Sequence, residues 1–387
     1  MILFELVPFE FLRVVWWLLI GVMLIAFALT DGFDMGTGML LPFVARTDLE
    51  RRVVINTVGP VWEGNQVWFI LGGGSIFAAW PPLYAISFSG FYMAMFLILT
   101  ALILRPVAFK YRSKREGTRW RAMWDRALFI GGFVPALLFG VAVGNVLLGV
   151  PFHLTPDLMP VYEGGLFGKL FGLLRPFALL CGLVSLAMAV MLGAGWLVLK
   201  TEGVIQDRAR AIGRPAALLA LAGYLLAGIW LAYGIQGYGF VTEPPHDGPS
   251  NPLLHQVTHG GSWLTAYAER PWIAIAPVLG VLGTLMAWRA IGRRGELSPL
   301  GWAQLGGFGM IASVGLVMFP FILPSNTHPD SSLSVWDASS SHLTLFVMLV
   351  GGAIFLPLIM VYTAWVYRVL WGKVTPDEVE NPDTHAY

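Results

Sequence analysis

The sequence predicts an all-α integral membrane protein with nine transmembrane helices, and three observations lead to this fold class. Of 387 residues, 57% are hydrophobic and only 12% are charged, against about 45–50% and about 25% in soluble domains. The mean hydropathy is +0.70. Apolar residues form long runs, and basic residues gather in every second connection between them. This composition excludes an ordinary soluble enzyme, a disordered chain and a nucleic-acid-binding protein.

Nine apolar runs are long enough to cross a bilayer, since a spanning helix needs about 20 residues. We expect one polytopic membrane domain over 1–387, with a tail at 372–387. The first run continues past the length of a signal-peptide core, so we expect a retained helix. The nine expected spans, in order, are 9–43, 52–78, 82–106, 122–149, 164–200, 206–236, 263–291, 299–323 and 336–371.

The basic residues predict the orientation, because Lys and Arg collect in short cytoplasmic loops. Twenty of the 24 lie in the tail and in the connections after spans 1, 3, 5 and 7, eight of them between Arg105 and Arg126. The other connections hold only Arg270. The N-terminus is therefore expected outside and the C-terminus in the cytoplasm. We interpret the basic run at 112–121 as a topology signal in contact with anionic lipid.

Two outer segments are rich in polar residues or proline. The connection 237–262 contains four prolines and three histidines, so we expect a structured loop there and no helix. The segment 334–342 precedes the last span. Asp337 or a neighbouring serine is expected to cap that helix, and ligand binding is the alternative role.

Three acids lie inside expected spans, where an ionisable side chain is costly and points to a function. Asp31 and Asp34 are three residues apart and share one helix face. Arg46 follows Asp34 by 12 residues, or about 18 Å of helix. Glu63 follows Arg52 by 11 residues, or about 17 Å. Because a short loop joins spans 1 and 2, we expect the three acids at similar depth.

Two interpretations of these carboxyls remain open. Carboxyls close together at low dielectric can exchange protons, which would make them a proton relay or an ion site. The alternative is a static polar network that fixes helix packing, and Gly32 and Gly36 of the same segment form a GxxxG pattern typical of close contact.

The seven histidines fall in outer connections, at helix ends or, for His385, in the tail, and none lies inside an expected span. Membrane haem proteins commonly ligate iron with His or Met from within their helices, so we expect no haem and no metal on this chain. The single cysteine, Cys181, lies in an apolar run and is expected to be a packing residue.

In several motifs the sequence resembles subunit II of the cytochrome bd-type quinol oxidases, a family that includes the cyanide-insensitive oxidases. The resemblance covers nearly the whole chain, with its motifs in the family's order. The motifs are Thr-Asp-Gly-Phe-Asp-Met-Gly at 30–36, Trp-Glu-Gly-Asn-Gln-Val-Trp at 62–68, Phe-Ala-Ala-Trp-Pro at 77–81, Phe-Ser-Gly-Phe-Tyr at 88–92, Tyr-Arg-Ser-Lys at 111–114, Gly-Val-Pro-Phe at 149–152 and Val-Trp-Asp-Ala-Ser-Ser-Ser at 335–341.

This resemblance implies a multi-pass protein of the bacterial inner membrane, with two four-helix bundles, one additional helix and a periplasmic N-terminus. It implies a haem-free subunit of an electrogenic ubiquinol oxidase that reduces dioxygen to water and takes up protons from the cytoplasm. The partner would be subunit I, with two b-type haems and one d-type haem; quinone, lipid and a small accessory subunit are further partners.

The family's proton path runs from the cytoplasm along the subunit interface. By resemblance, Glu63 is the first candidate for that path, and Asp34 and Asp31 follow. One departure is Lys110, since some members have an acid directly before Tyr-Arg-Ser-Lys. A cation there would repel protons and alter the cytoplasmic end of the path.

Two other functions fit the buried acids. The first is a proton- or cation-coupled secondary transporter, although no corresponding pair of broken helices is evident in two halves of the chain. The second is a purely structural subunit of the oxidase, with no part in proton transfer.

Overall fold

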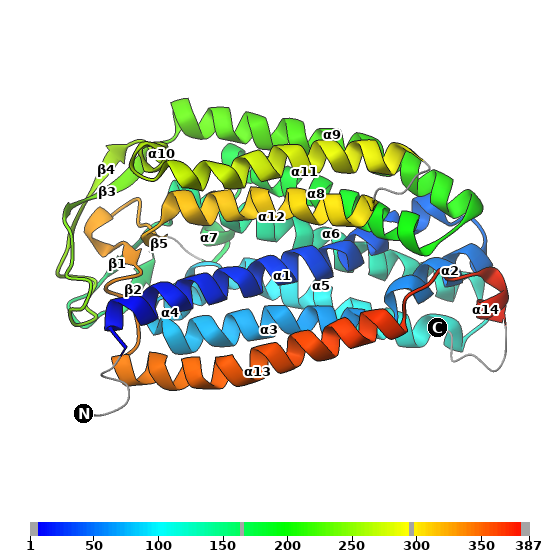
Figure 1. Ribbon diagram of the computed structural model, residues 1–387, viewed down its shortest axis with the longest axis horizontal. Helices are drawn as coiled ribbons and strands as arrows, with labels where there is room; N and C mark the ends of the chain where they lie inside the picture. The colour runs from blue at the N-terminus through cyan, green and yellow to red at the C-terminus, as the bar shows by residue number, and fades with distance from the viewer. Residues whose placement is uncertain (1–6, 163–165, 294–297, 381–387) are drawn as a thin grey trace.

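The computed structural model describes residues 7–162, 166–293 and 298–380, and it consists mainly of long helices along one axis (Figure 1). Eight helices of this part are long and apolar enough to cross a membrane, and a bent pair would make nine. The bent pair is α3 (Trp62–Ala79) and α4 (Pro81–Gly90), with a bend of 120°. The eight are α1 (Phe9–Val44), α5 (Tyr92–Tyr111), α6 (Thr118–Leu148), α8 (Pro176–Lys200), α9 (Gly203–Gly234), α11 (Ile275–Gly292), α12 (Pro299–Met318) and α13 (His342–Val369).

The expected second span, 52–78, is wrong as a single helix. α2 (Asp48–Val58) begins at a capping box, in which Thr47 and Glu50 each accept a hydrogen bond from the other's backbone N–H. α2 ends just before Pro60, which has no amide hydrogen to give to a helical bond. The helix starts again as α3, so no continuous helix joins Arg52 to Glu63.

Other expected spans are also divided. The third is divided between α4 and α5, which is followed by η2 (Arg112–Lys114). The fifth is divided between α7 (Leu166–Gly172) and α8. The seventh consists of α10 (Thr265–Glu269), η3 (Pro271–Ala274) and α11. Proline stands at the start of α4, α8 and η3, where its missing N–H and fixed φ favour a new helix.

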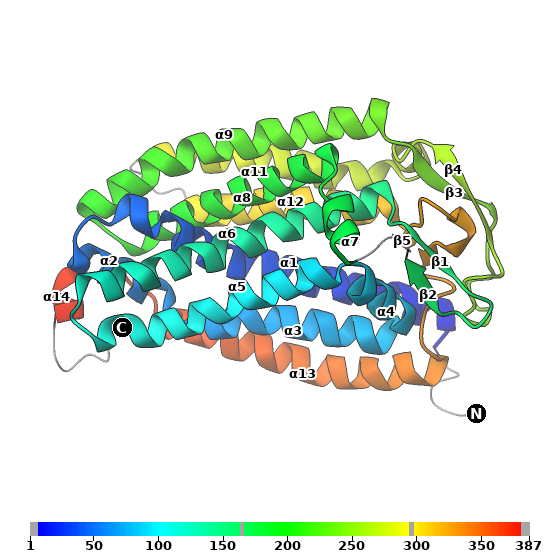
Figure 2. The same cartoon turned by 180° about the vertical axis from the view of Figure 1, so that it is seen from behind.

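α8 lies at the centre of the helices and packs against α1, α6, α9 and α12 (Figures 1 and 2). The α1–α8 contact is close because Gly36 faces Ala189 and Gly193: a Cβ at Gly36 would overlap the carbonyl oxygen of Ala189. This confirms the close packing expected from the glycine pattern. α13 contacts α1 and α3 and leaves most of its apolar surface exposed.

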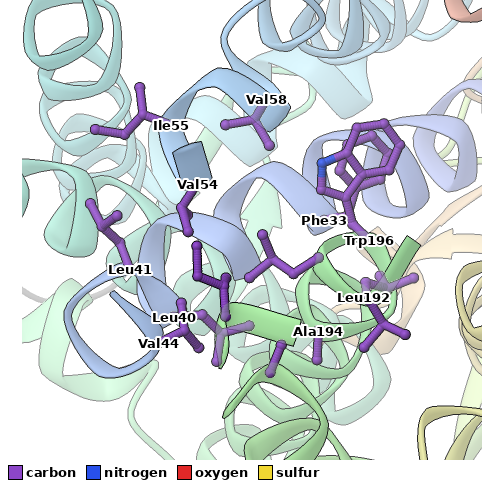
Figure 3. Packing of buried hydrophobic residues seen from close by; sticks show 14 of the residues in the cluster. Phe33, Leu40, Leu41, Val44, Val54, Ile55, Val58, Leu192, Ala194 and Trp196 are labelled. Carbon is purple, nitrogen blue, oxygen red and sulfur yellow. The ribbon is translucent and has the colours of Figure 1, made fainter. Parts of the chain in front are cut away.

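A hydrophobic cluster joins α1, α2 and α8 (Figure 3). Phe33 of α1 stacks on Trp196 of α8 with ring centroids 4.3 Å apart. Val54, Ile55 and Val58 of α2 belong to the same cluster. The apolar face of α2 is thus buried against the ends of α1 and α8.

Three hairpins gather at one end of the helices, together with the start of α1 (Figures 1 and 2). They are β1 (Phe152–Leu154) with β2 (Pro160–Tyr162), β3 (Gly237–Thr242) with β4 (Gln256–Gly261), and β5 (Phe321–Leu323) with β6 (Leu333–Ser334). The prediction of a structured, non-helical connection at 237–262 is confirmed.

Arg13 of α1 is fully buried and binds α1 to this hairpin end. Its Nε donates to Ser339 Oγ at 2.8 Å, and its Nη1 donates to the carbonyl of His246 at 2.5 Å. Its Nη2 donates to the carbonyl of Gly248 at 2.9 Å and to Ser250 Oγ at 3.0 Å. One side chain therefore joins α1, the segment between β3 and β4, and the segment before α13.

The opposite end carries α2, α14 (Pro376–Glu380) and the end of α13 (Figure 1). Arg52 donates to the carbonyl of Val379 at 2.9 Å, and Val374 N donates to the carbonyl of Lys200 at 2.8 Å. The segment after α13 is therefore bonded to both α2 and α8.

Candidate functional site

Asp31 and Asp34 lie on one face of α1, as expected, and both are buried, with 0% and 2% of their surface exposed. Arg105 of α5 lies opposite Asp31 and donates from Nη1 to Oδ2 at 2.8 Å and from Nη2 to Oδ1 at 2.7 Å. Arg105 is itself only 2% exposed. This bidentate geometry is the strongest form of an arginine–carboxylate pair.

The assignment of Arg105 to a cytoplasmic connection is therefore wrong. α5 continues for six residues beyond it, to Tyr111, and Arg105 points into the helix bundle because Asp31 supplies a paired negative charge there. A buried cation without such a partner would be strongly destabilising.

Asp34 has a different set of partners. Its Oδ2 accepts a hydrogen bond from Asn65 Nδ2 of α3 at 2.8 Å and lies 4.0 Å from Nη2 of Arg105. The Oδ1 of Asn65 accepts a hydrogen bond from the Tyr367 hydroxyl of α13 at 2.6 Å. A hydrogen-bonded chain thus runs from α13 through α3 to α1. Two carboxyls share one guanidinium, so the cluster is electrically neutral when one of them holds a proton.

Glu63 is not part of this cluster. It lies in the first turn of α3 and is exposed at the surface of the chain, two residues before Asn65, whose side chain faces Asp34. The expected similar depth of Glu63 and Asp34 agrees with that contact. Because residues two positions apart point to different sides of a helix, the inward position belongs to Asn65.

Sequence reasoning missed three members of the cluster: Arg105, Asn65 and Tyr367. Asn65 stands within the motif at 62–68, but uncharged polar residues in an apolar helix give a weak signal. Arg105 could have been found from the apolar residues at 107–109, which continue its span.

Two residues of the basic run at 112–121, Arg112 and Arg121, belong to a network of ion pairs at the α2 end, whereas Lys114, Arg115 and Arg119 are exposed. Asp125 of α6 accepts from Arg112 Nε at 2.6 Å and from Arg51 Nη1 at 2.8 Å. Asp48 of α2 pairs with Arg112 at 2.9 Å and with Arg121 at 2.6 Å. Arg112 is 1% exposed, which leaves its side chain no lipid contact on this chain. Lys110 is exposed at the end of α5.

At the hairpin end, Asp337 pairs with His255, whose Nδ1 lies 2.6 Å from its Oδ2; both side chains are at most 1% exposed. The other oxygen accepts from Ser334 N at 3.0 Å. The N-cap of α13 is Ser341, which accepts from Thr344 N. The expectation of a neighbouring serine as cap is confirmed, and Asp337 instead fastens the segment between β3 and β4.

The six histidines in the described residues lie at or near the hairpin end, in strands, loops or the first position of α13, and His385 lies outside the described residues. In the described part of the chain, no three His, Cys, Asp or Glu side chains gather as a metal site. Among the described residues, no histidine lies within a helix beyond its first position.

Comparisons with known proteins agree with the motifs. The family model described as cytochrome bd terminal oxidase subunit II matches residues 12–370. The chain is 46% identical to cytochrome bd-I ubiquinol oxidase subunit 2 of Escherichia coli strain K12, covering 98% of this chain and 99% of that protein. It is 44% identical to a probable cytochrome oxidase subunit 2 of Haemophilus influenzae, covering 98% and 100%.

The fold is similar to a chain in the structure of bd oxidase from Geobacillus thermodenitrificans. The TM-score is 0.66 at 16% identity, and the match covers 93% of this chain and 98% of that one.

Proposed function

Because the chain belongs to the cytochrome bd terminal oxidase subunit II family, we propose that it is the haem-free subunit II of a ubiquinol oxidase that reduces dioxygen to water. Membership in the family makes it a subunit of an oxidoreductase complex in a membrane. The proposal adds subunit I as the partner that holds the two b-type haems and the d-type haem, and the bacterial inner membrane as the location. Quinone, lipid and a small accessory subunit are the other proposed partners.

The haem-free role rests on where the histidines lie. All six described histidines are in loops or strands, or begin a helix, at or near the hairpin end. Haem iron inside the membrane is usually held by residues within helices. This chain would therefore cover the partner's haems and supply no ligand to them.

The proposed topology has the hairpin end in the periplasm and the α2 end in the cytoplasm. The α2 end carries the ion network of Arg51, Arg112 and Arg121, and basic residues favour the cytoplasmic side. We also propose two four-helix bundles. The first is α1, α3 with α4, α5 and α6; the second is α8, α9, α11 and α12; α13 is the additional helix. The contacts of α11 with α12 and α9, of α8 with α9, and of α1 with α3 and α6 support this grouping, and α8 joins the two groups through α1 and α6.

The observation that supports a proton path is that Asp31 and Asp34 differ in their hydrogen-bond partners. Asp31 has both oxygens bonded to Arg105, whereas Asp34 has one oxygen bonded to Asn65. Asp34 can therefore change protonation without breaking the arginine pair. Glu63, exposed on a helix at similar depth, would face the partner subunit and continue the path there.

The first experiment purifies the complex through a tag on this chain and records its visible spectrum. A d-type haem band from a co-purifying partner supports the proposal. Isolation of the chain without a haem-bearing partner would favour the transporter.

The second experiment uses Glu63→Gln and Asp34→Asn, which keep shape and remove the titratable group, with exposed Glu243→Gln as the matched control. We expect oxygen reduction and proton uptake to fall by about tenfold or more, with the haem spectrum preserved. Unchanged turnover across pH for both variants would leave the chain a structural subunit. Loss of haem in either variant would make that residue structural.

A further inference from the structure

A small cavity of about 10 Å³ lies beside Asp34, between α1, α2, α5 and α6. Its polar lining is Asp34, Thr37 and Arg105, and the rest of its wall is apolar apart from Gly38. The apolar side toward α2 is formed by Leu41, Val54, Ile55, Val58 and Phe109. Figure 3 shows Leu41 together with the three α2 side chains.

Two polar atoms of this lining have no hydrogen-bond partner within the described chain: Oδ1 of Asp34 and Oγ1 of Thr37. Both residues are at least 98% buried. They are three positions apart on α1, so they share a face. A buried polar atom left without a partner costs about 1–3 kcal/mol, and two such atoms beside one cavity call for a common partner.

A water molecule meets that need. It requires a cavity of about 10–15 Å³ and two to four polar partners. The cavity has this volume, and Asp34, Thr37 and Arg105 supply the partners. The apolar remainder of the wall leaves no room for an ion with its own hydration shell.

We infer that this cavity binds one water molecule, held by Asp34 Oδ1 and Thr37 Oγ1, and that Asp34 exchanges its proton through this water. The inference rests on the proposed proton path and adds its ligand and a positioning residue, Thr37. In the uptake step the bound water passes one proton to Oδ1 of the Asp34 carboxylate and regains one proton from a solvent hydronium ion. The bound water is then unchanged, and the carboxylate has become a carboxylic acid.

The pairing of Asp31 explains why the exchange takes place at Asp34. Both oxygens of Asp31 are held by Arg105, and Asp31 is not part of the cavity wall. Asp34 has Oδ2 fixed by Asn65 and Oδ1 free for the water. The positive charge of Arg105 thus lies close to Asp34, while Oδ1 of Asp34 remains available to the water.

The direct test is an electron cryo-microscopy map of the purified complex that resolves ordered waters. We expect density for one water between Asp34 and Thr37. A map with well-resolved side chains, no such density, and the Thr37 hydroxyl bonded to a carbonyl of α1 would overturn the inference.

The functional test compares Thr37→Val, which keeps the branched shape and removes the hydroxyl, with Thr37→Ser, which keeps the hydroxyl. Loss of one hydrogen bond to the water should slow proton uptake by about tenfold in Thr37→Val. Thr37→Ser should stay within about twofold of the parent. Equal effects of both variants would assign Thr37 to packing alone and overturn the inference.

Infrared difference spectra supply a readout apart from turnover. The band of the protonated Asp34 carboxyl, identified by its loss in Asp34→Asn, should shift in Thr37→Val and stay in place in Thr37→Ser. If Asp34→Asn leaves proton uptake unchanged, the proton path itself is wrong. If Asp34→Asn slows uptake while Thr37→Val changes neither uptake nor the band, only the water site is wrong.

Discussion

Arg105 and Asp31 form a bidentate pair inside the helix bundle: two nitrogens of Arg105 donate to the two carboxylate oxygens of Asp31 at 2.8 and 2.7 Å. The residues belong to α5 and α1 and are 74 positions apart. Because neither side chain has more than 3% of its surface exposed, the pair connects the two helices from a buried position.

Removing one partner of this pair should damage the fold. In Arg105→Met the Asp31 carboxylate loses its counter-charge, and we expect a loss of about 3–5 kcal/mol in stability, measured as a lower temperature of haem release from the complex. The double variant Arg105→Met with Asp31→Leu removes both charges and should recover most of that loss. A double variant as unstable as Arg105→Met alone would show that the pair is not the cause.

The contact between α1 and α8 tolerates no side chain at Gly36. In Gly36→Ala the new methyl group overlaps the carbonyl of Ala189, so the helices must separate at a cost of about 1–3 kcal/mol or more. Gly21→Ala is the matched control in the same helix, because a Cβ there meets nothing within 4 Å. We expect lower yield of the assembled complex for Gly36→Ala alone. Equal yields for both variants would contradict this packing.

The buried Asp337–His255 pair should keep the segment between β3 and β4 in place. Asp337→Ala leaves His255 Nδ1 and Ser334 N without their partner, at about 1–3 kcal/mol each. Hydrogen exchange of residues 243–262 should become faster. The control is Asp157→Ala, an exposed acid between β1 and β2 at the same end of the helices. Equal rates of hydrogen exchange in the two variants would contradict this role of the Asp337–His255 pair.

Glu50 contributes to the stability of the folded protein by an amount that depends on pH. Burial acts to raise its pKa, but hydrogen bonds from the backbone of Arg46, from Arg208 and from the backbone of Thr47 outweigh burial and lower it. A carboxyl with a lowered folded pKa stabilises the fold above its unfolded pKa, and this is lost as pH falls through the folded pKa. We therefore expect Glu50→Gln to cost about 1 kcal/mol near neutral pH.

The difference between Glu50→Gln and the parent should shrink as pH falls from about 6 toward about 3. Thermal unfolding of the two complexes over this range measures it. A difference that stays constant with pH would mean that the carboxylate charge plays no part.

Much of the fold follows from apolar run length. α1, α6 and α9 begin and end within about four residues of their expected limits, because a run this long and apolar has no stable alternative in a membrane. The divided spans depend on local breakers: Pro60 separates α2 from α3, and the pair at 81–82 starts α4. These prolines were visible in the sequence, but a hydropathy average hides them.

The site was predictable only in part. The spacing of Asp31 and Asp34 predicts a shared face, because helix periodicity is local. Arg105 was assigned to a loop because the rule for basic residues considers each charge alone. Its place inside the bundle depends on an acid 74 positions away, which no local pattern contains. The same holds for Tyr367, which reaches the cluster from the last long helix.

The hydrogen bonds of Arg13 have a consequence for the order in which the chain is inserted and folded. Its partners lie 233 to 326 positions later in the chain, so α1 is inserted long before any of them exists. A charged side chain without a partner remains at the membrane–water interface. We therefore expect Arg13 to keep the start of α1 at the membrane surface until the later segments are made, and its burial to accompany the packing of the hairpin end.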